Sequence, residues 1–159
     1  FETGEKIDNN LFKKMKKART FQAAMHMARQ LEFSIFDFRL HVEFASRKEL
    51  NIQKLIEEVR QDVAIAEVPE FNRFQHSFSH IFSGGYAAGY YSYKWAEVLS
   101  ADAFSKFEEK GIFDESTGRE FLEAILEKGG SCEPMDMFVE FRGRKPSVEP
   151  LLKNAGITI

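Results

Sequence analysis

The side chains best suited to chemistry gather between Phe74 and Trp95, a segment that reads FQHSFSHIFSGGYAAGYYSYKW. It holds two of the four histidines of the chain and all four tyrosines. A phenol stays protonated near neutral pH and donates a hydrogen bond without titrating, which suits an oxyanion that develops in a transition state. The chain is rich in Phe, so tyrosines at these positions indicate that their hydroxyl groups are used.

Three of these tyrosines, Tyr86, Tyr90 and Tyr93, follow the spacing i, i+4, i+7. This spacing predicts that three phenols share one stripe of a helix from about residue 86 to residue 110, while Tyr91 points elsewhere. Core packing is the alternative interpretation of the same stripe.

Two histidines, His76 and His80, have the i, i+4 spacing that zinc proteases use in His-Glu-x-x-His. Ser77 stands where that motif needs its general base, and no cysteine pair or acidic cluster lies nearby at ligand spacing. The sequence therefore favours two histidines in a loop, bonded to backbone or solvent. A small metalloprotein that uses both remains a second interpretation.

Three glycines of the same segment make the backbone permissive. Gly84, Gly85 and Gly89 suit a loop that moves or that lets a ligand chain pass close by. No Gly-Lys-Ser/Thr follows, and no strand precedes, so neither a phosphate-binding loop nor a dinucleotide fingerprint is present. A tight turn before a helix is the alternative.

The elements that must position these residues are predicted to be helices, because no segment shows clean two-residue alternation. Asp8, Ser147 and Thr20 are candidate N-caps, and Gly111 is a candidate C′ residue. We expect one domain, 1–159. The predicted helices cover about residues 11–19, 21–44, 51–66, 86–110, 115–128 and 134–142, with a last one between 147 and 156.

The second of these helices carries apolar residues at spacings of three and four on two faces. We therefore expect it to be enclosed on more than one side, by neighbours within the chain or outside it. Arg29, Glu32, Asp37 and Arg39 lie in the same helix, which excludes a membrane span.

The composition excludes several classes of function. A net charge of −3 offers no basic field to a nucleic acid, and the single cysteine, Cys132, cannot form an intrachain disulfide, so we expect a cytoplasmic protein. The 17 Phe residues imply an extensive core or a face that awaits a partner. The chain starts at Phe1 without a signal peptide, and we expect it to be cut from a longer polypeptide.

Several segments resemble the thimet oligopeptidase family of zinc peptidases. Residues His80 to Phe104 are similar to the glycine-rich substrate loop and the helix that follows it in that family. Four further segments resemble the bacterial oligopeptidase A branch of the family: RQLEF (29–33), FDFRLH (36–41), FRGRKP (141–146) and EPLL (149–152). The resemblance covers essentially the whole chain.

The resemblance implies an all-α chain, the multi-helix C-terminal portion of the catalytic lobe of a zincin-type oligopeptidase. Such an enzyme cleaves short peptides in a deep channel and holds zinc with a His-Glu-x-x-His helix and a later Glu. Neither element is in this sequence. We therefore expect zinc in the full-length enzyme, no metal bound to this fragment, and an inactive isolated chain whose partner is the N-terminal part of the same protein.

The resemblance also assigns roles on the substrate side. It implies that Tyr93 and His80 are catalytic, as donors to the oxyanion. Tyr86 and Tyr90 position the substrate, and Gly84 with Gly85 forms the loop that flexes over peptides. A non-catalytic helical module that binds a peptide or protein through its Phe- and Tyr-rich face remains the alternative, and neither nucleic acid nor a membrane is expected as a partner.

Overall fold

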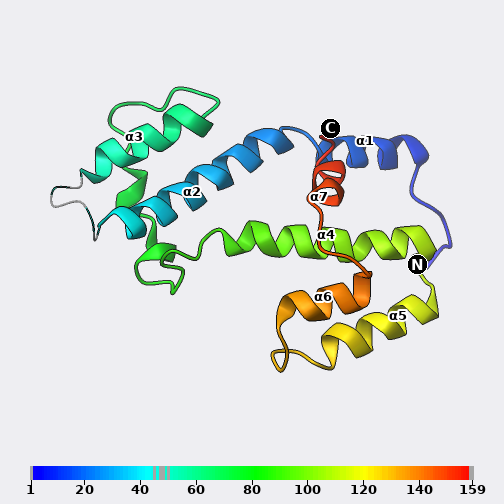
Figure 1. Cartoon of the computed structure of the whole chain (residues 1–159). Helices are drawn as coiled ribbons and strands as arrows, with labels where there is room; N and C mark the ends of the chain where they lie inside the picture. Colours follow the sequence, from blue (N-terminus) through cyan, green and yellow to red (C-terminus); the bar gives the residue numbers. More distant parts are fainter. Residues whose placement is uncertain (1, 45, 47–48, 50, 158–159) are drawn as a thin grey trace. The chain divides into compact units, whose positions relative to one another are not determined.

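The computed structural model describes residues 2–44, 46, 49 and 51–157 (Figure 1). These residues form helices and no strand, so the predicted all-α class is confirmed. The α-helices are α1 (Asn9–Arg19), α2 (Ala23–Phe44), α3 (Ile52–Val63), α4 (Ser92–Lys110), α5 (Glu115–Phe121), α6 (Pro134–Arg142) and α7 (Glu149–Asn154). Two short 3-10 helices, η1 (Phe74–His76) and η2 (Ser79–Ile81), and one π-helical turn, η3 (Leu122–Leu126), complete them.

Local capping accounts for several helix ends. The Asp8 carboxylate accepts from the N–H groups of Asn10 and Leu11 at the start of α1, as predicted. Asn51 caps α3 in the same way. At the other end of a helix, Gly111 follows α4 with φ 126°, a left-handed value that favours glycine, and the prediction of Gly111 as the helix terminator is confirmed.

One predicted boundary of α2 and one of α3 were wrong. The second helix starts at Ala23 rather than residue 21, because Gln22 adopts φ 55° and the N–H of Ala23 bonds to the carbonyl of Thr20. Thr20 is thus the C-cap of α1. The third helix ends at Val63 rather than residue 66, since Ala64 is already extended.

The chain divides into two compact units, and we describe each by itself. The first comprises the described residues up to Gly89 together with Ala155–Ile157, and the second comprises Tyr90–Asn154. The expectation of one domain over residues 1–159 stays a prediction.

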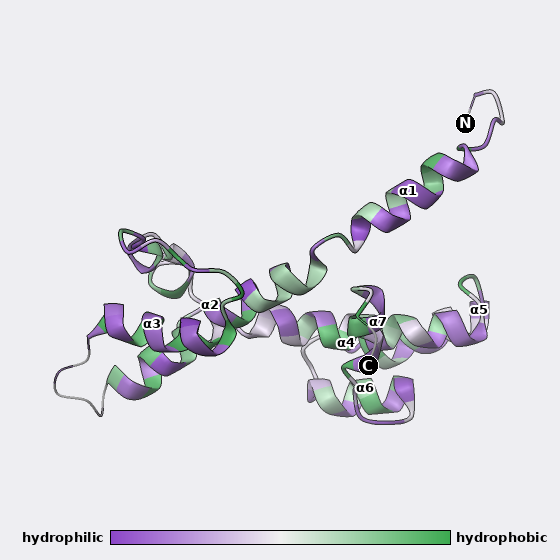
Figure 2. Cartoon of the chain, turned by 90° about the horizontal axis from the view of Figure 1, so that it is seen from above, coloured by the Kyte–Doolittle hydropathy of each residue, from purple (hydrophilic) through white to green (hydrophobic). Residues whose placement is uncertain are grey.

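In the first unit α2 packs against α3. Their contact buries Phe36, Leu40, Leu55, Ile56 and Val59. Hydrophobic and hydrophilic residues alternate along the ribbon of α3, as expected of a helix with one buried face (Figure 2).

Several large apolar side chains of α2 are partly exposed. Among them, Met25, Leu31, Phe38 and Val42 are exposed by between 41% and 57%. Within the described part of the chain, none of the helices has the length and apolar character needed to cross a bilayer.

In the second unit α4 contacts α5, α6 and α7. The core between them contains Ala103, Ala124, Phe138 and Phe141. The rings of Phe121 and Phe141 meet edge to face, with centroids 5.1 Å apart.

A fully buried carboxylate, Asp102, lies on α4 in this unit. Arg144 donates to both of its oxygens, with N···O distances of 2.6 Å, and Arg142 Nε donates at 3.1 Å. The N–H of Ser147 donates to Oδ2 at 2.7 Å. Burial raises the pKa of Asp102, but the bonds from Arg144, Ser147 and Arg142 outweigh it and hold that pKa below its ordinary value.

Candidate functional site

His76 and His80 lie in two separate 3-10 turns, η1 and η2, within the predicted loop. Between the turns, Ser77 Oγ donates to the carbonyl of Phe74 at 3.0 Å, and the N–H of Ser79 donates to the carbonyl of Ser77 at 2.9 Å. Both imidazoles are exposed. Since no helix spans the two residues, the i, i+4 spacing places no common helical face here.

Gly84 is seated against the backbone of His80. A Cβ at Gly84 would lie 2.8 Å from the carbonyl oxygen of His80, closer than real side chains come. The Ser79 carbonyl accepts from the N–H of Ser83 and of Gly84, and the His80 carbonyl accepts from the N–H of Tyr86 at 3.0 Å. The loop therefore folds back onto its own start, and only glycine fits at residue 84.

Gly85 has a different reason to be glycine. Its φ is +80°, and a Cβ there would meet nothing within 4 Å. Conformation rather than space selects this residue. The two glycines thus give the loop one close contact and one left-handed turn.

The loop brings two of the predicted site residues together. The ring centroids of His80 and Tyr86 are 6.4 Å apart. The ring centroid of Phe78 is 5.8 Å from that of His80. Phe78 in turn packs on Phe33 of α2 and on Phe74. An aromatic cluster therefore connects the candidate histidine to α2.

The prediction that Tyr86, Tyr90 and Tyr93 form one helical stripe was wrong. α4 begins at Ser92, so of these three only Tyr93 is helical. Ala88 adopts φ 54°, and the N–H of Gly89 bonds to the carbonyl of Tyr86, which makes a turn where a helix was expected. A left-handed alanine cannot continue a right-handed helix.

Tyr90 and Tyr93 belong to the second unit. Their rings meet edge to face, with centroids 5.2 Å apart. Tyr90 is buried, at 8% exposure, whereas Tyr93 is 39% exposed. The phenol of Tyr93 is thus the more accessible of the two.

Asp37 is a residue of this region that sequence reasoning missed as functional. Its carboxylate, fully buried on α2, accepts from the N–H of Ala88 at 2.9 Å, across 51 positions of sequence. His41 Nδ1 lies 3.0 Å from Asp37 Oδ1 and 2.8 Å from the Asp37 carbonyl. Both are acceptors, so Nδ1 carries the proton. The available signal was an Asp within an enclosed helix, since a buried charge needs partners.

A comparison with models of protein families shows to which family this chain belongs. The model of Peptidase family M3 matches residues 1–157. The chain belongs to this family. The resemblance drawn from the sequence is thereby confirmed.

Named relatives agree with this membership. Oligopeptidase A of Escherichia coli is 54% identical over 157 residues, which are 99% of this chain and 23% of that protein. Oligopeptidase A of Haemophilus influenzae has the same identity and the same two coverages. A probable cytosolic oligopeptidase A of Arabidopsis thaliana is 49% identical over 162 residues, 99% of this chain and 23% of that protein. The chain thus spans about a quarter of the length of these relatives.

Zinc was the cofactor implied for the full-length family M3 enzyme. In the part of the chain that the structure describes, no three His, Cys, Asp or Glu side chains gather as ligands for a metal ion. The described residues therefore do not fit a zinc site, and we derive no step through the metal. That this fragment binds none stays a prediction.

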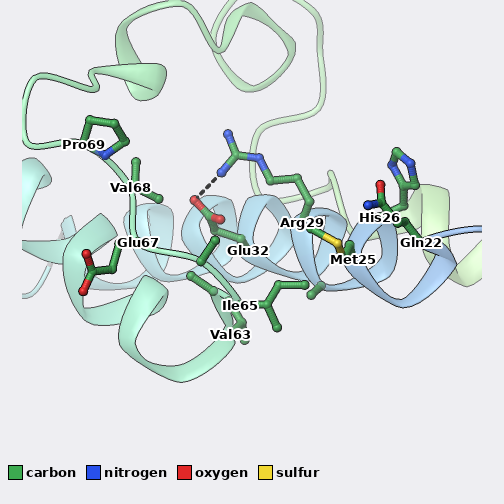
Figure 3. Close-up of a pocket in the computed structure, with 13 residues that line it drawn as sticks. Gln22, Met25, His26, Arg29, Glu32, Val63, Ile65, Glu67, Val68 and Pro69 are labelled. Carbon is green, nitrogen blue, oxygen red and sulfur yellow. Dashed lines mark hydrogen bonds and ion pairs between the residues drawn. The ribbon is translucent and has the colours of Figure 1, made fainter.

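A pocket of about 380 Å³ lies between α2 and the segment 63–69 (Figure 3). Its wall is mainly apolar, with Met25, Ile65 and Val68 among its residues. Glu32, which is 3% exposed, accepts there from Arg29 at 2.7 Å and from Arg60 at 2.9 Å. Neither His80 nor Tyr86 lines this pocket, so it does not join the candidate residues.

Proposed function

We propose that this chain is the C-terminal, substrate-facing part of a zinc metallopeptidase that hydrolyses short peptides. The observation that carries the proposal is the loop in which Gly84 packs on the backbone of His80 and Tyr86 lies beside the imidazole. Such a loop presents a slim backbone and two hydrogen-bonding side chains to a peptide. Membership of Peptidase family M3 and relatives named oligopeptidase A support peptides as the substrate.

His80 and Tyr93 are the proposed donors to the oxyanion. His80 is exposed on its turn, and Tyr93 is more than one-third exposed on the first turn of α4. A preorganised donor of this kind contributes about 2.7–4 kcal/mol of transition-state stabilisation. Both side chains stabilise the negative charge that develops on the carbonyl oxygen of the substrate.

Tyr86 and Tyr90 are assigned to substrate positioning. The N–H of Tyr86 bonds to the carbonyl of His80, which keeps the Tyr86 ring beside the imidazole. Tyr90 packs edge-on against Tyr93 and restricts the rotation of that phenol. In this proposal Gly84 and Gly85 let the loop approach the peptide backbone.

The rest of the same polypeptide is the proposed partner of this chain. It would supply the zinc ligands and contact exposed apolar side chains of α2 such as Leu31 and Val42. A cytoplasmic location stays a prediction.

The test is hydrolysis of a short fluorogenic peptide with zinc added. We expect no turnover by the 159-residue chain and clear turnover when it is expressed with the region that the parent reading frame encodes before Phe1. Robust turnover by the chain alone would contradict the proposal. An inactive long polypeptide without a His-Glu-x-x-His motif would favour the helical interaction module instead.

A matched pair of variants tests the oxyanion role. Tyr93→Phe removes one hydroxyl and should lower kcat of the long polypeptide about 100- to 1000-fold, as loss of an oxyanion donor does. Tyr91→Phe is the control, since Tyr91 is also exposed and has no role in the proposal. Equal kcat values for the two variants would remove Tyr93 from the mechanism.

A further inference from the structure

We propose that Asp37 is a positioning residue for the substrate loop, acting through the backbone of Ala88 on the residues that precede it. This inference rests on the proposed function, because it assigns Tyr86 a task in binding peptides. Asp37 itself touches no substrate in this proposal. It is a buried group on α2 that no step of the peptide chemistry requires.

The Asp37 carboxylate is well placed to hold the loop. It is fully buried, and its Oδ1 accepts from the N–H of Ala88 at 2.9 Å. The protonated Nδ1 of His41, one helical turn away, lies 3.0 Å from the same oxygen. A bond to a carboxylate is stronger than one between neutral groups, and a buried carboxylate left without partners is costly. The contact between Asp37 and Ala88 should therefore persist.

Ala88 needs such a contact because of its backbone. Its φ of 54° places a residue with a Cβ in the left-handed region, where only glycine is comfortable. Glycine adopts this conformation with less strain, yet the chain has its glycine at the next position, Gly89. A strained alanine persists only where its surroundings hold it, and Asp37 supplies that hold.

The other end of the loop is fixed as well. There the carbonyl of His80 accepts from the N–H of Tyr86, and Gly84 is seated on the His80 backbone. Tyr86 therefore lies between two fixed points, the His80 turn and Ala88, with Gly85 as the residue of greatest freedom. If Ala88 is released, the C-terminal half of the loop loses its fixed point and Tyr86 samples more positions.

The consequence for a peptidase is a change in binding rather than in the chemical step. Tyr86 positions the peptide, so a looser Tyr86 weakens uniform binding and raises KM more than it lowers kcat. Misplacement by about 1 Å is enough for a large loss of catalytic efficiency. A defect of general folding would instead lower the active fraction and leave KM unchanged.

The experiment uses the long polypeptide that includes the region encoded before Phe1. Asp37→Ala should raise KM for the fluorogenic peptide about tenfold or more. Asp37→Asn should stay close to the parent, because its amide oxygen still accepts from Ala88. Asp62→Ala, which changes an exposed carboxylate of α3, is the control.

Hydrogen exchange of the segment 84–89 provides a readout that does not depend on activity. It should accelerate in Asp37→Ala and stay slow in Asp37→Asn. Unchanged KM and unchanged exchange in Asp37→Ala would overturn the positioning role. An inactive parent polypeptide would instead overturn the proposed peptidase function, and the exchange result would still decide whether Asp37 holds the loop.

Discussion

Two aspartates, Asp37 in the first unit and Asp102 in the second, are buried to the same degree, yet their surroundings differ in kind. Asp102 accepts from two arginines and from the N–H of Ser147. Asp37 accepts from the N–H of Ala88 and lies beside a histidine. One carboxylate thus accepts from two permanently charged side chains, whereas the other accepts from the backbone of a turn.

The difference shows what each carboxylate does for the molecule. Removing Asp102 takes from Arg144 the buried carboxylate to which it donates, although Arg142 still pairs with Glu109. The contribution of Asp102 is therefore to the stability of the unit. Removing Asp37 releases a turn at the edge of the candidate site, so its contribution is to the geometry of a loop. Burial alone does not separate the two roles, and the charge of the partners does.

The largest expected effect comes from the same isosteric change at both sites. Asp102→Asn places an NH₂ group against the donors of Arg144 and Ser147 and should cost about 3–5 kcal/mol of unfolding free energy. Asp37→Asn keeps an acceptor for Ala88 and should cost about 1 kcal/mol. Urea denaturation of the parent and both variants measures the two values. Equal losses would break the distinction between them.

A smaller effect is expected in the loop itself, where the two glycines are constrained differently. Gly84→Ala puts a Cβ against the carbonyl of His80, and the loop must shift, so kcat/KM of the long polypeptide should fall about tenfold or more. Gly85→Ala meets no atom and bears only the conformational cost of about 1–2 kcal/mol. Peptide hydrolysis compares the two variants. A milder defect in Gly84→Ala than in Gly85→Ala would contradict the seating of Gly84 on His80.

The smallest expected effect is a change in acid sensitivity. Because the pKa of folded Asp102 is lowered, its stabilisation is complete above the pKa of the unfolded carboxyl and is lost as the pH falls through the lowered folded value. Unfolding free energy measured from about pH 5 to about pH 2 should decline more steeply in the parent than in Asp102→Asn. The variant still contains Asp114 and Glu120, whose pKa values are also lowered, so they cancel in the comparison. Identical slopes would show that Asp102 does not contribute.

Much of the helical framework was predictable because its signals are local. Pro134 and Gly143 delimit α6, and the predicted range 134–142 is the observed one. The start of α4 was not predictable in this way. The segment 86–91 has helical spacing, but Ala88 forms a turn there and donates to a carboxylate from α2 that is distant in sequence.

In the candidate site, too, some features were predictable from local sequence and others were not. Residue types and spacing were sufficient to single out His80, the Gly84–Gly85 pair and the tyrosines, and the resemblance of several segments indicated the family that the comparison confirmed. Which of these side chains lie together was decided by contacts that are distant in sequence: Phe33 with Phe78, and Asp37 with Ala88. A cap or a turn reaches only about four residues along the chain, so its hydrogen bonds can be read locally. A left-handed alanine and a buried carboxylate become stable only when the folded chain brings them together.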